Sequence, residues 1–185
     1  MSSFPSLVLV GASGSGKSEV AEALGLQLGL PVVESEENAS LILGSPVGVA
    51  MTDDPESALE ALAVAACEVL TPNGPGAGSI VVLSASSILN PEVFEGVVEA
   101  KAGGARVVGL RASLSTLVRR NGLDAPRPAA LGTPRAWFRA QLTVLEEAYS
   151  KVVDLWCDTD TCDGSMAARL ITAELGADSL IKARN

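Results

Sequence analysis

Apolar residues follow two different spacings along the chain. Short continuous apolar runs predict buried strands and lie at residues 7–10, 31–33, 80–83, 106–110 and 152–157. Segments whose apolar residues recur every three or four positions predict helices and begin near residues 18, 55, 91, 113, 135 and 164. This alternation of strands and helices indicates an α/β fold with a parallel sheet that helices cover on both faces.

Two of the helices have well-marked starts. Asp54-Pro55-Glu56 and Asn90-Pro91-Glu92 each combine a capping side chain, a proline in the first turn and an acid that complements the helix dipole. The buried stripe of the first of these helices is expected to hold Leu59, Leu62, Ala63, Ala66, Val69 and Leu70. Before it, residues 37–51 are mixed in pattern, and Leu41-Ile42-Leu43 is expected to pack one short helix.

The last two helices are also amphipathic. We expect Phe138, Leu142, Leu145 and Tyr149 to share one side of the helix over residues 135–151, and Met166, Leu170 and Ile171 to pack the final helix. Trp137 and Tyr149 are expected to be core aromatics or to contact the segment before this helix. That segment, residues 121–134, holds glycine and three prolines with little apolar pattern, which predicts a mobile flap.

The first strand ends in a glycine-rich turn that predicts a phosphate-binding loop. The pattern Gly11-x-x-x-x-Gly16-Lys17-Ser18 lets backbone N–H groups converge on phosphate oxygens, while the lysine reaches the terminal phosphates and the serine hydroxyl ligates Mg²⁺. The helix that follows adds the positive end of its dipole. An exposed linker rich in glycine and serine can carry the same letters, but the preceding strand and the following amphipathic helix favour the phosphate site.

Composition narrows the choice of partners. With 185 residues, 48% of them apolar and 19% charged, the chain suits one domain over residues 1–185. A net charge of −9 without a basic run argues against nucleic acid or an anionic membrane as the main partner. The first residues lack a secretion signal, so we expect a cytoplasmic protein. The absence of histidine and the spacing of the three cysteines exclude a zinc site and a Ser-His-Asp triad.

Two acids follow the second strand. Glu34 and Glu36 lie at its carboxyl end, which is the edge of an open α/β sheet where ligands bind. A solvated polar turn is the alternative explanation.

These motifs resemble the shikimate kinase family over residues 7–175. The family's lid pattern matches Arg119-Arg120 followed by Arg127-Pro128, and its Asp-x-Asp pair falls on Glu34 and Glu36. The resemblance implies a three-layer P-loop NTPase fold with a five-stranded parallel sheet of order 2-3-1-4-5. It also implies an acceptor-binding region near residues 36–70 and a lid near residues 121–134.

The resemblance also implies roles for single residues. ATP would be held by Gly11, Ser13, Gly14, Ser15, Gly16, Lys17, Ser18, Glu19 and Arg120. Arg120 would stack on adenine, and Lys17 and Arg127 would stabilise charge on the transferring phosphoryl group, although both arginines could instead be solvated surface charges. Mg²⁺ would be bound by Ser18 and, through water, by Glu34. Glu36 would orient the acceptor hydroxyl or take its proton.

The acceptor half departs from the family pattern. Leu59-Glu60 and Leu145 stand where the family has two arginines that bind the shikimate carboxylate, and Ser86-Ser87 replaces the family's three consecutive glycines after the third strand. Each charge-assisted contact contributes about 1.5–3 kcal/mol, so losing two should weaken carboxylate binding by roughly two to four decades. Glu60 would add repulsion. We therefore expect Glu36, Glu60, Ser86 and Ser87 to surround an acceptor other than shikimate.

Three functions remain compatible with these residues. The first is an ATP-dependent kinase for a polyol or an amine, since carboxylates around the cavity repel anions. The second is a catalytically degenerate relative that binds nucleotide, and the third is an enzyme similar to gluconate kinases. The expected partners are a nucleotide and a small acceptor, with the protein a monomer or a weak dimer.

Overall fold

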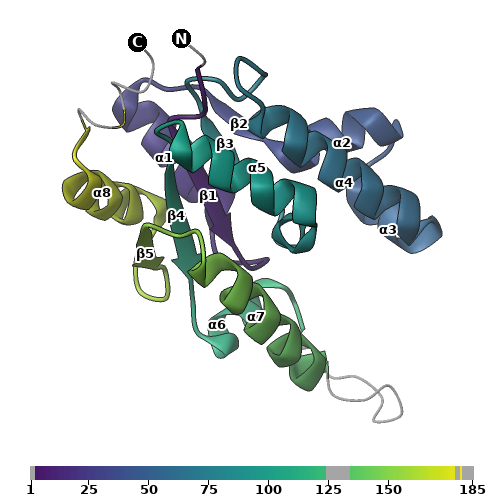
Figure 1. The fold of residues 1–185 in the computed structure, drawn as a ribbon. Coiled ribbons are helices and arrows are strands. Elements are labelled where there is room, and N and C mark those ends of the chain that lie inside the picture. Colours follow the sequence, from purple (N-terminus) through teal and green to yellow (C-terminus); the bar gives the residue numbers. More distant parts are fainter. Residues whose placement is uncertain (1–2, 124–133, 178–179, 181–185) are drawn as a thin grey trace.

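The computed structural model describes residues 3–123, 134–177 and 180. Within them, strands and helices alternate as the sequence predicts (Figure 1). The strands are β1 (Leu7–Gly11), β2 (Val32–Glu34), β3 (Ile80–Val82), β4 (Arg106–Arg111) and β5 (Leu155–Asp158). The helices are α1 (Lys17–Leu28), α2 (Ser35–Leu43), α3 (Val47–Asp53), α4 (Pro55–Leu70), the 3₁₀ turn η1 (Ser87–Leu89), α5 (Pro91–Ala102), α6 (Leu114–Arg120), α7 (Pro134–Ser150) and α8 (Gly164–Leu175).

The five strands form one parallel sheet of order β2-β3-β1-β4-β5, which confirms the predicted order. Leu7 of the central strand lies opposite Ile80 on one side and Arg106 on the other. All five residues of β1 are buried. The loop that follows β1 therefore starts from the most enclosed strand of the sheet.

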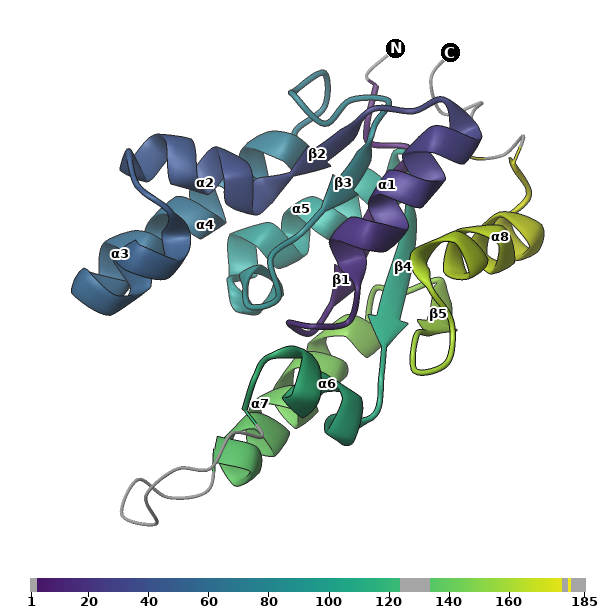
Figure 2. The ribbon, with the colours of Figure 1, turned by 180° about the vertical axis from the view of Figure 1, so that it is seen from behind.

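Alternate residues of β1 face two different hydrophobic clusters. Leu7 and Leu9 pack with α1 and α8, whereas Val8 and Val10 pack with α4, α5 and α7. Figures 1 and 2 show these helices on opposite faces of the sheet. The side-chain period of two along a strand thus gives the three-layer arrangement that the sequence predicts.

Two helical groups extend beyond the sheet. The helices α2, α3 and α4 enclose a small cluster of their own and reach past the β2 edge, while α6 and the first turns of α7 lie beyond the carboxyl ends of β1 and β4 (Figure 1). Both predicted helix starts are confirmed, because the Asp54 side chain accepts from the Ser57 N–H and the Asn90 side chain accepts from the Glu92 N–H. None of the helices in the described ranges is long and apolar enough to cross a membrane.

Five residues that were expected to pack the helices, and Trp137, are instead exposed. Leu41 is 80% exposed and Ile42 is 51% exposed, because α2 packs through Ala39 and Leu43, and residues 37–51 contain parts of two helices rather than one. Leu59, Met166 and Leu170 are about half exposed, since α4 and α8 are covered on one side. Trp137 is 63% exposed, whereas Phe138, Leu145 and Tyr149 are buried as predicted.

Two further expectations concern segment boundaries. The last strand begins at Leu155 rather than at residue 152, because the N–H groups of Val152 and Val153 both donate to the Tyr149 carbonyl and continue the end of α7. Most of the expected flap at 121–134, including Arg127, lies outside the described residues.

Candidate functional site

The loop between β1 and α1 has the backbone geometry of a phosphate cradle. Gly14 and Gly16 have φ values of +80° and +88°, which lie in the left-handed region that favours glycine. A Cβ atom at Gly14 would also lie 2.6 Å from Nδ2 of Asn121. The glycines at these positions are therefore required by conformation and, at Gly14, by a close neighbour.

Lys17 is held over this loop. Its ammonium group donates to the carbonyls of Gly11 at 2.9 Å and Ala12 at 3.3 Å. Burial lowers the pKa of Lys17 to about 8, while the nearby carboxylates of Glu36 and Glu34 act in the opposite direction. The lysine is thus mostly charged at neutral pH and loses its charge just above it.

Asn121 joins the loop to the end of α6. Its amide nitrogen donates to the Ser13 carbonyl at 2.9 Å and to the Leu117 carbonyl at 2.8 Å, and its carbonyl oxygen accepts from the Ser13 hydroxyl at 2.7 Å. Ser13 and Asn121 are 108 residues apart, so no local pattern indicated the contact. Sequence reasoning missed this residue.

Arg120 and Thr159 support the same loop from the β5 side. The Arg120 guanidinium donates to the carbonyls of Gly14 at 3.1 Å and Thr159 at 2.9 Å. The Thr159 hydroxyl donates to the carbonyl of Ser15, which is fully buried within the loop. Arg120 is therefore occupied with the loop backbone, and its expected stacking on adenine stays a prediction.

A polar cavity of about 370 Å³ opens in front of the loop. Most of its lining comes from the loop and the start of α1, from the end of β2 and from the start of α2. The lining residues are Ser13, Gly14, Gly16, Lys17, Ser18, Glu19, Glu34 and Glu36, together with Val82, Leu83 and Ser84. Both predicted acids thus reach the phosphate side of the sheet. Both carboxylates lie near enough to Lys17 to oppose the effect of burial on its pKa, and their part in binding stays a prediction.

The donor set of this cavity fits Mg²⁺. The metal needs few protein oxygens when nucleotide phosphates and water complete its shell, and Ser18, Glu34 and Glu36 offer hydroxyl and carboxylate oxygens here. The described residues contain no group of three or more acidic, cysteine or histidine side chains placed to hold a metal without a nucleotide.

Glu19 has a structural contact besides its place in this cavity. Its carboxylate accepts from the Gly164 N–H at 3.0 Å, at the start of α8. A Cβ atom at Gly164 would come within 2.7 Å of Glu19, so the two helices meet closely at this glycine. The carboxylate is favourable there because it lies at the positive end of the α8 dipole.

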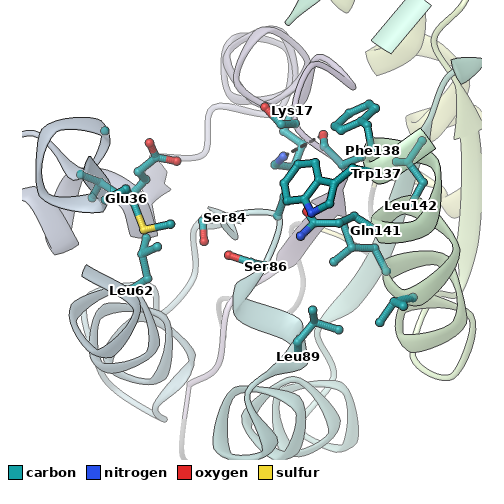
Figure 3. Close-up of a pocket in the computed structure, with 18 of the residues that line it drawn as sticks. Lys17, Glu36, Leu62, Ser84, Ser86, Leu89, Trp137, Phe138, Gln141 and Leu142 are labelled. Atoms are coloured by element: carbon teal, nitrogen blue, oxygen red, sulfur yellow. Dashed lines mark hydrogen bonds between the residues drawn. The ribbon is translucent and has the colours of Figure 1, made fainter. Parts of the chain in front are cut away.

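A second cavity, of about 560 Å³, adjoins the first and shares Ser13, Lys17, Glu36 and Ser84 with it. Apolar side chains dominate its lining (Figure 3). The apolar residues are Ala12, Val47, Met51, Leu62, Ala85, Leu89, Trp137, Phe138, Ala140, Leu142, Val144 and Leu145, and Gly48, Ser86 and Gln141 complete the described lining. Lys17 is the one cationic side chain among these residues.

Of the four residues expected to surround the acceptor, two line the larger cavity and two do not. Glu36 and Ser86 line the larger cavity. Ser87 is buried behind it, where its hydroxyl and that of Ser84 share a hydrogen bond. Glu60 is exposed and is not among the described lining residues, because it lies about 200° around α4 from Leu62, which does line the cavity. The expectation that Glu60 faces the acceptor is therefore not supported by its position.

Comparisons with known proteins agree with this geometry. The sequence profile of the shikimate kinase family matches residues 13–175. A shikimate kinase of Thermobifida fusca is 33% identical over 177 residues, covering 96% of this chain and 98% of that protein. A shikimate kinase of Salinispora tropica is 33% identical over 156 residues, covering 84% and 89% of the two chains.

Solved structures agree at the level of the fold. A shikimate kinase from Acinetobacter baumannii in complex with shikimate superimposes with a TM-score of 0.76 at 19% identity, covering 93% of each chain. A gluconokinase from Sinorhizobium meliloti superimposes with a TM-score of 0.55 at 24% identity, covering 97% of this chain and 98% of that one.

Proposed function

Because the chain belongs to the shikimate kinase family and is an ATP-dependent small-molecule kinase, we propose that it phosphorylates a hydroxyl group of an acceptor that carries no carboxylate. The observation that supports this most directly is the charge of the larger cavity. Its described lining holds one cation, Lys17, which the phosphate loop uses, and one carboxylate, Glu36. An acidic acceptor would find repulsion there without a compensating arginine.

The side chains would divide the work of an in-line phosphoryl transfer. Lys17 neutralises charge on the transferring group, Ser18 ligates Mg²⁺, and Glu34 holds the water shell of the metal. When bound, Mg²⁺ neutralises the charge of the β- and γ-phosphates. Glu36 lies in both cavities and so orients the acceptor hydroxyl and accepts its proton. Arg127, which lies outside the described residues, would add a second positive charge from the lid.

The position of Leu145 supports the loss of carboxylate binding. It stands where the resemblance expects an arginine, and its side chain is buried in the cavity wall, among apolar neighbours. Leu59-Glu60 stands at the other expected arginine, and Glu60 faces away from the cavity. An acidic acceptor would therefore be repelled by Glu36, and Glu60 would add nothing to this repulsion.

A coupled ADP-release assay tests the proposal. Purified protein with ATP and Mg²⁺ would be supplied with shikimate, polyols, amino alcohols or sugar acids. We expect turnover with an uncharged or amine-bearing alcohol, and a value of kcat/KM for shikimate at least 100-fold lower, from the lost arginine contacts. Efficient turnover of shikimate would contradict the proposal. A flat response to every acceptor, together with tight nucleotide binding, would favour the non-catalytic alternative.

The expected cytoplasmic location and the monomeric or weakly dimeric state stay predictions.

A further inference from the structure

The larger cavity has two apolar walls that belong to different parts of the chain. One wall comes from α3 and α4 and includes Met51 and Leu62, and the other comes from α7 and includes Trp137 and Leu142. In Figure 3 these walls face each other across the segment that carries Ser84 and Ser86. A ligand in this cavity would be enclosed by apolar groups on both sides.

The polar groups of the cavity gather where it meets the phosphate site. Ser13, Lys17, Glu36 and Ser84 line both cavities, and Ser86 follows two residues after Ser84. The rest of the described lining offers Gln141 as a polar side chain. The hydroxyl that receives phosphate would therefore lie at one end of the acceptor, and the remaining volume is suited to groups that need few hydrogen bonds.

Several apolar lining residues are left exposed. Met51 is 40% exposed, Leu89 is 48% exposed and Trp137 is 63% exposed. Exposed apolar groups concentrated around a concave site mark a binding surface, since covering them releases water at a gain of about 25 cal/mol for each Å² buried. The continuity of this surface with the phosphate site, through shared lining residues, points to the acceptor as its occupant.

We propose, on the basis of the proposed function, that the acceptor carries an apolar body, a ring or a chain, beside its reactive hydroxyl. The body lies between Met51 and Leu62 on one side and Trp137 on the other, and the hydroxyl faces Glu36 and Ser86. This excludes small polyols as the preferred acceptors and favours hydroxylated compounds with an apolar substituent. The volume of about 560 Å³ leaves room for a substituent the size of a phenyl ring.

Three probes that share one hydroxylated ring separate charge from apolar contact. They are shikimate, methyl shikimate and benzyl shikimate. The step from the acid to the methyl ester removes the negative charge and tests the proposed function. The step from the methyl to the benzyl ester adds a phenyl ring and tests the apolar body.

Binding can be measured without turnover, through the fluorescence of Trp137. The chain has two tryptophans, and Trp156 packs against Tyr149 with ring centroids 6.5 Å apart and is not among the described residues that line the larger cavity. The variant Trp156→Phe leaves Trp137 as the single reporter for titrations in the presence of ADP and Mg²⁺. The variant Trp137→Phe serves as the control and should show no response.

We expect benzyl shikimate to bind roughly tenfold more tightly than methyl shikimate and to shift the Trp137 emission, because the phenyl ring covers apolar side chains of both walls. In Met51→Gln, which keeps the size of the side chain but makes it polar, this preference should fall at least threefold. The matched control is Val49→Gln, on the same helix, because Val49 is about half exposed and is not among the described lining residues.

The outcomes distinguish the two proposals. If methyl shikimate binds more tightly than shikimate but the benzyl ester gains nothing further, the apolar body is wrong and the proposed function stands. If shikimate binds most tightly, the proposed function is wrong. A benzyl preference that is unchanged in Met51→Gln, or that leaves the Trp137 emission unaltered, would overturn the placement of the body between these walls.

Discussion

The phosphate loop and the larger cavity adjoin each other and are built in different ways. The loop comes from one short stretch, residues 11–18, and its shape depends on glycine conformations and on hydrogen bonds to backbone carbonyls. The cavity is assembled from α3, α4, α7 and the segment after β3, and its character depends on side chains. The nucleotide half therefore depends on the backbone of one loop and on the side chain of Lys17, whereas the acceptor half depends on many side chains from separate elements.

Lys17→Ala should have the largest effect, because it removes the cation from the nucleotide half. Mg²⁺ and ATP at millimolar concentration should raise the melting temperature of the unaltered protein, and the variant should lose most of this stabilisation. Its kcat should fall by about 10³-fold. Lys151→Ala changes an exposed lysine and serves as the control. An equal ATP-induced shift in the Lys17 variant would show that the loop does not bind the polyphosphate as described.

Glu36→Gln tests the point at which the two regions meet. The amide cannot accept the proton of the acceptor hydroxyl, so kcat should fall by about 100-fold while ATP-induced stabilisation is largely kept. Glu37→Gln is the matched control, since Glu37 is exposed on the same helix and is not among the described residues that line either cavity. Similar losses in both variants would remove Glu36 from its proposed role.

The pH dependence of nucleotide capture tests the environment of Lys17. Because burial lowers the pKa of its ammonium group to about 8, the free protein loses this charge as the pH rises through that value. The value of kcat/KM for ATP should then fall about tenfold per pH unit above pH 8, since this ratio reports on the free enzyme. The value of kcat should fall less, because bound phosphates favour the charged lysine. A flat kcat/KM up to pH 9.5 would contradict the assignment.

Asn121→Ala should have the smallest effect, and it should be confined to the nucleotide half. The change removes both hydrogen bonds to Ser13, so we expect the KM for ATP to rise about three- to tenfold while the KM for the acceptor stays unchanged. Ser13→Ala removes one of the two bonds and should have a smaller effect. If the KM for the acceptor changed while the KM for ATP did not, Asn121 would belong to the acceptor site and not to the nucleotide site.

The fold could be predicted largely from the sequence, because its signals are local or come with the family resemblance. The turn after β1 and the capping residues Asp54 and Asn90 follow from short patterns, and the strand order follows from the resemblance. The roles expected for single residues of the phosphate loop stay predictions. The support that Asn121 and Thr159 give to the loop comes from contacts over more than one hundred residues, which no local pattern reports.

The acceptor half was harder to predict because helix periodicity gives a face but not the neighbour that covers it. Leu41 and Leu59 fit an apolar pattern and are nevertheless exposed. Family position predicts that Glu60 faces the cavity, whereas α4 buries Ala58, Ala61 and Leu62 and leaves Glu60 on another side of the helix. The apolar walls could not be foreseen, since they join helices from two distant parts of the chain.

The ratio of kcat/KM for methyl shikimate to that for shikimate, measured side by side at pH 7 with saturating ATP and Mg²⁺, tests the central claim most directly. Among the described lining residues, the cavity has no cation besides Lys17, and this predicts that the ester is the better acceptor by at least tenfold. A ratio below one would show that the cavity binds a carboxylate after all.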